Sequence, residues 1–274
     1  MQIIDHTEQF IRQVLDKNDR RAYEQVYPEL FDHYYKFWSE RGMIPDTTSA
    51  ASVRDSAGFI RSRLSFIMDR FEDSDLDISA LNLVLFVGQG TTNGHAFRDA
   101  GKFVVWIPVE TYTTALLVDV FVIHEICHAL HYRSSPGFYF QNRNEKELVS
   151  RQLITEGLAT ALTAEVLATD DLTALWGDFL SAEAAGAWLT ECRRHEAKLC
   201  RFVRDNFNTS DLALHLFHAF DPEDIFAYRA GYYVGLQVIR HISKKQGLDL
   251  RDIMCMESKD LTDMARSALD HLLS

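Results

Sequence analysis

The stretch Phe121-Val-Ile-His-Glu-Ile-Cys-His-Ala-Leu130 decides how this chain is organised, because it contains His124-Glu125-x-x-His128. On a helix, two residues four apart lie on one face, about 6 Å apart along the axis. Both imidazoles can therefore reach one Zn²⁺ at about 2.0–2.1 Å. Glu125 lies about 100° further round the helix, beside such an ion and not on it. A carboxylate in that place can accept a proton from water, as the general base of a metalloprotease does.

The residues around the motif predict a buried helix over 113–132. From residue 116 to residue 130 every side chain is uncharged except Asp119 and the motif itself. A solvated helix would carry Lys or Glu around the motif. The alternative interpretation is a core helix with two hydrogen-bonded histidines and an incidental carboxylate. Burying one Glu and two His without partners costs several kcal/mol, so a metal site is favoured.

Length and composition indicate a water-soluble globular protein. The 274 residues are 47% hydrophobic and 25% charged, and they can bury a sizeable core. A net charge of −12 argues against a nucleic-acid partner, which needs a basic patch. The same charge is compatible with peptide or protein substrates. The sequence leaves the oligomeric state open.

Cysteine spacing and the first residues predict a cytoplasmic protein. Four widely spaced cysteines form no C-x-x-C pair and are expected to be reduced thiols: Cys127, Cys192, Cys200 and Cys255. The first residues, from Met1 to Glu8, contain neither a basic nor an apolar leader region. We find no uncharged apolar run of 18 residues and expect no membrane span.

Hydrophobic periodicity predicts a mainly helical chain with a small sheet. Helices are expected at 4–17, 21–40, 52–71, 113–132, 145–168, 171–184, 186–206 and 222–244, with one or two short helices over 249–272. The aromatic stripe within 21–40 is assigned to core packing. Short apolar runs at 81–87 and 103–109 predict two strands, and residues 42–51 predict a loop.

The glycine-bearing segment Gly88-Gln-Gly-Thr-Thr-Asn-Gly-His95 suggests a competing function. A strand followed by G-x-G-x-x-x-G resembles a dinucleotide-binding turn, but that turn must open a helix in a βαβ unit. Here the next element predicted is another strand. We therefore expect the segment to connect two strands without binding phosphate.

Glu156 is the predicted third metal ligand. A catalytic zinc site has three protein ligands and one open position. Glu156 follows His128 by 28 residues, on the next predicted helix, and Gly157 beside it allows a second helix to approach closely. The alternative is a surface glutamate. His131 lies about 10 Å along the helix from His124 and is assigned to packing, and His215-x-x-His218 lacks an acidic base.

The segments His124-Glu-Ile-Cys-His128 and Thr155-Glu-Gly-Leu-Ala159 resemble the gluzincin type of zinc metallopeptidase. Arg229-Ala-Gly-Tyr-Tyr-Val-Gly235 is similar to a segment of an uncharacterised bacterial family of predicted zinc-dependent proteases. The resemblance covers residues 80–240 and implies an α+β, zincin-like fold. In that fold a small sheet has its edge strand over the cleft, and a helical C-terminal half carries the third ligand. Many gluzincins have an Asp four residues after the ligand Glu, where this chain has Thr160.

The sequence therefore predicts a zinc-dependent hydrolase, a metallopeptidase that cleaves peptide bonds. One domain spans 1–274, with an N-terminal helical part (1–75), a catalytic core (80–240) and C-terminal helices (241–274). Zn²⁺ is the expected cofactor, and the expected roles are ligands His124, His128 and Glu156, general base Glu125, oxyanion donor Tyr232 or Tyr233, and substrate-binding residues His95 and Arg229. Tyr228 and Tyr232 could instead be a core pair on one helix, and Gly231 and Gly235 a close-packing face. Two other functions stay open, a zinc-binding scaffold or regulator without hydrolysis and a nucleotide-binding protein.

Overall fold

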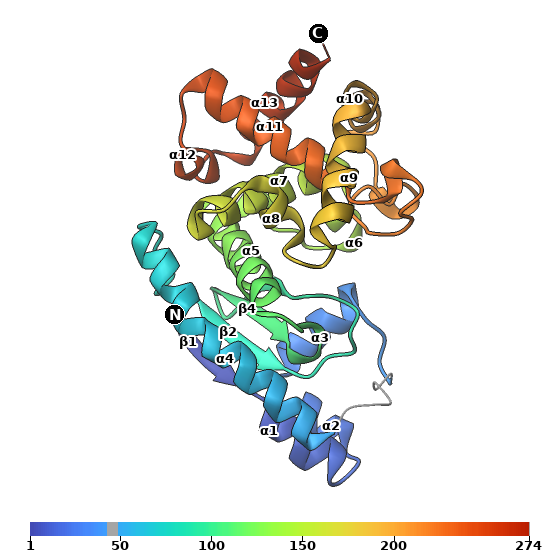
Figure 1. Ribbon diagram of the computed structural model, residues 1–274. Helices are drawn as coiled ribbons and strands as arrows, with labels where there is room; N and C mark the ends of the chain where they lie inside the picture. The colour runs from blue at the N-terminus through green and yellow to red at the C-terminus, as the bar shows by residue number, and fades with distance from the viewer. Residues whose placement is uncertain (43–48, 274) are drawn as a thin grey trace. The chain divides into compact units, whose positions relative to one another are not determined.

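The computed structural model describes residues 1–42 and 49–273 of the chain. The chain divides into two compact units, Met1–Ala129 and Leu130–Ser274. The division falls within one continuous helix, α5 (Ala115–Ser134; Figure 1). The prediction of a single domain over 1–274 stays a prediction, as does its division into three parts.

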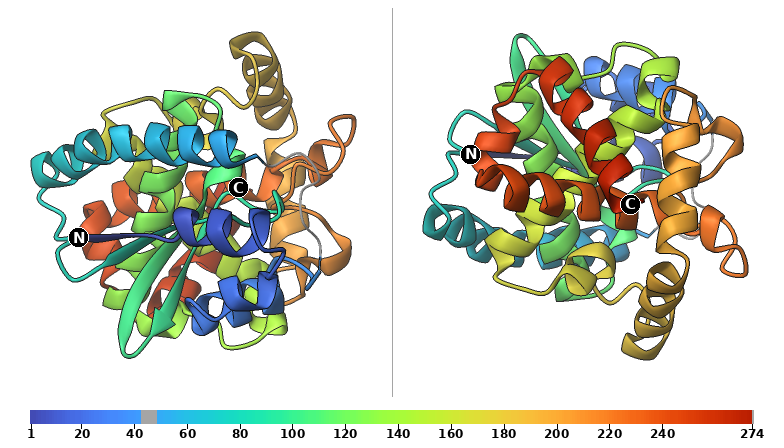
Figure 2. Two further views of the ribbon diagram at one scale, coloured as in Figure 1. Left: turned by 90° about the horizontal axis from the view of Figure 1, so that it is seen from below. Right: turned by 90° about the horizontal axis from the view of Figure 1, so that it is seen from above.

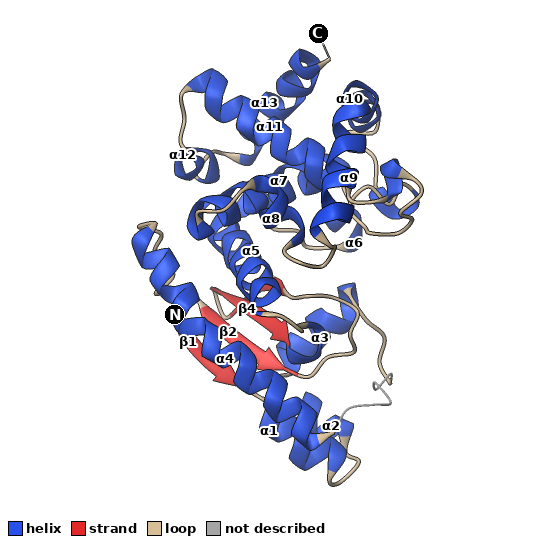
Figure 3. Cartoon of the chain, in the orientation of Figure 1, coloured by secondary structure: helices blue, strands red, loops and turns tan. Residues whose placement is uncertain are grey.

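The first unit contains a four-stranded mixed sheet, shown red in Figure 3. Its strands are β1 (Gln2–Asp5), β2 (Asn82–Phe86), β3 (His95–Asp99) and β4 (Lys102–Pro108), in the spatial order β1-β2-β4-β3. The first three in that order run parallel, and β3 pairs antiparallel with β4 at the edge. The small sheet confirms the mainly helical α+β class that the sequence predicted.

The two strands at the centre of the sheet are those that the sequence predicted. In β2 and β4 nearly every residue is buried, which is the pattern of strands covered on both faces. The two outer strands were missed. Residues 2–5 form β1 and not the start of the helix predicted from residue 4, because Ile3 and Ile4 pair with Leu83 and Val84. Such a partner lies too far along the chain to appear in a local pattern.

Helices of the first unit surround this sheet. They are α1 (Thr7–Phe10), continued by a π-helix (Ile11–Leu15), then α2 (Arg20–Glu24), α3 (Pro28–Phe37) and the long cyan helix α4 (Ala50–Asp73) in Figure 2. The helix predicted over 21–40 is interrupted at Pro28, which lacks an N–H and begins α3. Ser49 caps α4 by accepting from the N–H of Ser52, so the helix begins before the predicted start at residue 52. The predicted loop 42–51 falls mostly on residues 43–48, outside the described residues.

The second unit is built from helices. After the end of α5 these are α6 (Arg143–Lys146), α7 (Val149–Leu167), α8 (Asp171–Trp176), α9 (Ala182–Arg194), α10 (Glu196–Asp205), α11 (Ala230–Gln246), α12 (Leu250–Met254) and α13 (Ser258–Leu272). Helix α11 packs mainly against α7, and also against α13, beside which it lies in the right-hand view of Figure 2.

Helix α11 begins later than the sequence predicted. Asp221 and Asp224 accept hydrogen bonds from N–H groups two residues on, which are local turns and not the cap of a long helix. The helix starts at Ala230, after Arg229 adopts a left-handed conformation with φ of 56°. The prediction of a helix from residue 222 is therefore wrong, because short side-chain turns give the same Asp-rich signal as a helix start.

Helix α5 is apolar on all sides. Among the described helices it alone is long and apolar enough to cross a membrane by length and composition, and 89% of its most apolar window is buried inside the structure. The core helix of a water-soluble protein has the same composition, because a helix surrounded by protein needs apolar residues on every face.

Candidate metal centre

Helix α5 carries both predicted histidine ligands in a buried position. His124 is 5% exposed and His128 is 3% exposed. Their Nε2 atoms lie 3.0 Å apart, because residues four apart on a helix project from the same face. Two nitrogens bound to one tetrahedral Zn²⁺ would lie about 3.3 Å apart. The pair is therefore already close to the geometry that one shared ion requires.

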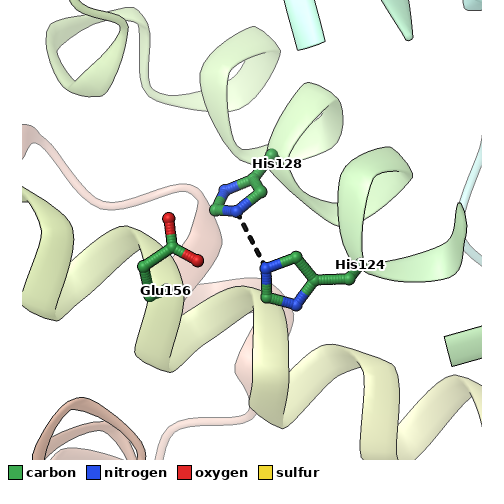
Figure 4. Close-up of side chains that lie close together, drawn as sticks. All are labelled: His124, His128 and Glu156. Atoms are coloured by element: carbon green, nitrogen blue, oxygen red, sulfur yellow. Dashed lines mark hydrogen bonds between the residues drawn. The ribbon is translucent and has the colours of Figure 1, made fainter. Parts of the chain in front are cut away.

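Glu156 on α7 completes a three-residue group (Figure 4). His124, His128 and Glu156 each offer one ligand atom, and these atoms all lie within 4.8 Å of one another. Two imidazole nitrogens and one carboxylate oxygen are a donor set that binds Zn²⁺. The described residues contain no other such group of His, Cys, Asp and Glu. The residues present therefore fit a zinc ion.

Glu125 lies next to the metal group and faces the edge of the sheet. Its Oε2 is 3.9 Å from Nδ1 of His95, the first residue of β3. Gly94, just before His95, has a φ of +152°, and a Cβ added there would lie 3.1 Å from Cγ of Glu125. The positive φ favours glycine, and a side chain there would press on the Glu125 side chain. The structure thus brings His95 next to the candidate general base, and its predicted role in substrate binding stays a prediction.

His95 belongs to an aromatic group that the sequence interpretation did not connect with the site. The ring of Trp38 lies 4.3 Å from that of His95, and the ring of His33 stacks at 5.8 Å. Burial lowers the pKa of His33 to about 3, with a smaller contribution from nearby Lys36, so its ring is neutral. The aromatic stripe of residues 21–40 was the available signal, and it was assigned to core packing. That assignment holds for Tyr34, which is fully buried.

Tyr232 and Tyr233, the two candidate oxyanion donors on α11, contact different neighbours. The hydroxyl of Tyr233 donates to Glu196 at 2.7 Å, and burial raises the pKa of this tyrosine. The ring of Tyr232 lies under the guanidinium of Arg229, whose central carbon is 4.1 Å from the ring centroid. Tyr228 precedes α11, so the predicted core pair of Tyr228 and Tyr232 on one helix is wrong.

Other histidines considered from the sequence have packing roles. His131 is 1% exposed, and its ring lies 4.7 Å from that of Phe138. His215 has a φ of 55° and stacks on Phe220 at 4.0 Å. His218 lies with its ring 6.2 Å from that of His215 and is in no metal-binding group within the described part of the chain.

The glycine segment after β2 is held by side chains from outside it. Glu110 accepts hydrogen bonds from the N–H groups of Gly88 at 3.1 Å and Gly90 at 3.0 Å. Burial raises the pKa of Glu110. The hydroxyl of Tyr34 accepts from the N–H of Gln89 at 2.9 Å. The N–H groups that would bind a phosphate thus donate to a carboxylate of the chain itself. The segment is followed by strand β3, so it connects two strands, as predicted.

Thr160 occupies the position at which many gluzincins have an aspartate. Its side chain is fully buried, and its hydroxyl has no hydrogen-bond partner within the described part of the chain. Thr163, three residues further along α7, donates its hydroxyl to the carbonyl of Ala159. The chain therefore differs from many gluzincins here, because helix α7 has no carboxylate at residue 160 to orient an imidazole.

Comparison with known proteins gives one match. A family model described as "Predicted Zn-dependent protease (DUF2268)" matches residues 66–263, which is more than half of the chain and includes both α5 and α7. Neither the proteins of curated function nor the solved structures include a significant match. The matched range contains the complete group His124, His128 and Glu156. This chain therefore belongs to that family of predicted zinc-dependent proteases, and Zn²⁺ is its cofactor.

Proposed function

We propose that the chain is a metallopeptidase of the gluzincin type. The observation that carries the proposal is the group of His124, His128 and Glu156, whose ligand atoms lie within 4.8 Å of one another. The residue following the first ligand, Glu125, is buried and 8% exposed. Three protein ligands from two helices with a carboxylate beside them are what catalysis of hydrolysis by zinc requires.

In the proposed reaction Glu125 moves the proton. When bound, Zn²⁺ supplies Lewis acidity that activates water and polarises the peptide carbonyl. Glu125 takes one proton from the attacking water as the C–O bond forms. It then gives this proton to the amide nitrogen as the C–N bond breaks, so that one acid and one amine are released and Glu125 is regenerated. Tyr232 or Tyr233 is the proposed donor to the carbonyl oxygen, and the hydroxyl of Tyr233 also donates to Glu196.

The edge of the sheet supports a zincin-like arrangement for the substrate. Strand β3 lies at the edge, and its first residue is the one that faces Glu125. A peptide in extended conformation can pair with an edge strand, and the side chain of His95 would then contact it. We propose that β3 and His95 bind the segment of peptide that contains the scissile bond.

The substrate class and location complete the proposal. We propose a peptide or protein substrate, a cytoplasmic location and neither a nucleic-acid nor a membrane partner. The net charge of −12 supports the exclusion of nucleic acid. Four free cysteines support a reducing compartment.

The second candidate is a zinc-binding scaffold or regulator that performs no hydrolysis, because the same three ligands would bind zinc in such a protein. The change Glu125→Gln separates the two. It removes the proton acceptor and leaves all three ligands, so zinc content measured by atomic absorption should stay at one per chain. Hydrolysis of a casein-derived peptide mixture, followed by mass spectrometry, should be lost.

Glu165→Gln is the matched control, since Glu165 is an exposed carboxylate on α7, the same helix as Glu156. It should retain both zinc and hydrolysis. If the unaltered zinc-loaded chain cleaves no peptide, or if Glu125→Gln cleaves as fast as the unaltered chain, the peptidase proposal is wrong.

A further inference from the structure

Arg229 is a cation held by aromatic rings without an acidic partner. Its guanidinium carbon lies 4.1 Å from the ring centroid of Tyr232 and 4.7 Å from that of Trp176. Within the described part of the chain no Asp or Glu forms an ion pair with it. Other arginines of this unit do have acidic partners, such as Arg240 with Asp171 at 2.7 Å.

The two ring contacts leave the donors of the guanidinium available. A guanidinium that contacts aromatic rings uses its faces, whereas its five N–H groups point outward in its own plane. That planar set of donors matches the two oxygens of a carboxylate. The side chain is half-buried, so both the rings and the partial exclusion of water would strengthen such a bond.

The backbone of Arg229 is unusual in a way that fits a binding role. Its φ of 56° is a left-handed conformation in which glycine is the favoured residue. Arg229 is also the residue that precedes the first turn of α11. The partial positive charge of a helix N-terminus adds to that of the guanidinium there, so the position favours an anion.

Arg229 and Glu156 both belong to the second unit, where α11 packs mainly against α7. Helices α7 and α11 cross where Gly157 contacts Gly235, and Glu156 is the neighbour of Gly157. Arg229 is six residues before Gly235, which is about 9 Å along a helix axis. An extended peptide spans about 3.3–3.6 Å per residue, so 9 Å corresponds to two or three peptide residues.

We propose that Arg229 binds a carboxylate of the substrate, two or three residues from the bond that is cleaved. This inference rests on the proposed peptidase function and names its substrate class, a peptide with a negative charge at that distance. The carboxylate can be the C-terminus of the peptide, which makes the enzyme a carboxypeptidase that removes short fragments. It can equally be the side chain of an Asp or Glu within a longer peptide.

Three short peptides distinguish these sources. The probes are acetyl-alanyl-phenylalanyl-alanine with a free C-terminal carboxylate, its C-terminal amide, and the amide in which glutamate replaces the last alanine. Binding is measured by isothermal titration to the zinc-loaded Glu125→Gln chain, which keeps the peptides intact. We expect a peptide bearing a carboxylate to bind at least about tenfold more tightly than the neutral amide. The tighter of the two carboxylate peptides identifies the source.

Variants at Arg229 test the residue itself. Arg229→Gln should reduce the ratio of affinities, carboxylate peptide to neutral amide, to about one. Arg229→Lys should keep part of this preference, because lysine retains the charge without the planar donors. Arg240→Gln is the matched control, on the helix that follows Arg229, and should keep the whole preference for the carboxylate peptides. Zinc content and the unfolding midpoint should not change in any of these variants. If Arg229→Gln does not fold, the test is made with Arg229→Lys, which should bind the carboxylate peptides with a reduced preference.

The outcomes separate this inference from the proposed function. Equal affinity for the three peptides, including no measurable binding, or a preference that survives Arg229→Gln, overturns the role of Arg229. Absence of cleavage by the unaltered chain, with a preference that depends on Arg229, overturns the peptidase proposal and leaves Arg229 as a carboxylate-binding residue.

Discussion

Gly157 on α7 and Gly235 on α11 are in direct backbone contact beside the third candidate ligand. A Cβ built on Gly157 would lie 2.4 Å from both the carbonyl carbon and the oxygen of Gly235. A Cβ on Gly235 would lie 2.4 Å from the carbonyl oxygen of Leu153. Because these neighbours are backbone atoms, neither can move without displacing a helix. The close approach of the two helices thus depends on both glycines, which confirms the small-residue face that the sequence predicted for Gly235.

Gly157→Ala should therefore lower the free energy of unfolding by about 3 kcal/mol, since overpacking in a fixed core costs about 1–3 kcal/mol and sometimes more. Urea unfolding followed by circular dichroism measures this change. Gly186→Ala is the matched control, because a Cβ at Gly186 on α9 meets nothing within 4 Å. It should stabilise the protein by roughly 0.5–1 kcal/mol through the helix propensity of alanine. Equal effects of the two changes would contradict the close packing at Gly157.

Glu156→Ala should reduce zinc affinity by at least about 100-fold, because it removes a ligand, and even partners of ligands contribute about 10–100-fold. Affinity is measured by competition with a chromophoric chelator. The control is Glu165→Ala, an exposed position on the same helix, which should leave the affinity unchanged. Retention of one zinc per chain by Glu156→Ala after dialysis against that chelator would show that Glu156 is not a ligand.

His33→Phe should make the protein less sensitive to acid. In the folded chain the pKa of His33 is lowered to about 3, first by burial and then by Lys36, from an ordinary value of 6.5. Between these pH values the unfolded chain binds the proton and the folded chain does not, so stability falls as the pH decreases from 6.5 towards 3. Phenylalanine keeps a ring against His95 and cannot take a proton. Unfolding free energies at pH 7.5 and pH 5 should therefore differ less for the variant, and equal differences in the two proteins would contradict the burial of a neutral His33.

The unaltered chain should bind neither ATP nor NAD through the segment after β2. The N–H groups of Gly88 and Gly90 already donate to Glu110. Isothermal titration with each nucleotide should give no heat of binding at a protein concentration of about 50 μM, where a dissociation constant below about 10 μM would be evident. Tight binding of either nucleotide would revive the dinucleotide-binding function that the glycine spacing suggested.

The parts of the site that the sequence predicted correctly depend on local patterns. Helix α5 was expected at 113–132 and is found at Ala115–Ser134, because a run of apolar residues with two histidines four apart defines a helix by itself. Glu156 was expected beside these histidines from its neighbours on the next helix, and it lies with them in one group. Neither expectation needed information about distant parts of the chain.

The parts that were missed depend on contacts between distant residues. Strand β3 is only five residues long and contains the polar residues His95, Arg98 and Asp99, so the pairing with β4 defines it and its composition does not. The ring contact of Trp38 with His95 joins residues 57 positions apart, and nothing in the helical stripe distinguishes this ring from its buried neighbours. Arg229 was proposed for substrate binding from a family-like segment, but its ring contacts with Trp176 come from the tertiary fold.

The pairing of β1 with β2 also has a consequence for how the protein is made. Gln2 pairs with Asn82, so β1 has no partner until 80 further residues have been synthesised. At about 5–20 residues per second this interval is roughly 4–16 s. During that time Ile3 and Ile4 belong to an unpaired apolar strand, which is the kind of segment that associates with other chains. We therefore expect β1 to be most prone to association with other chains before residue 86 has been synthesised.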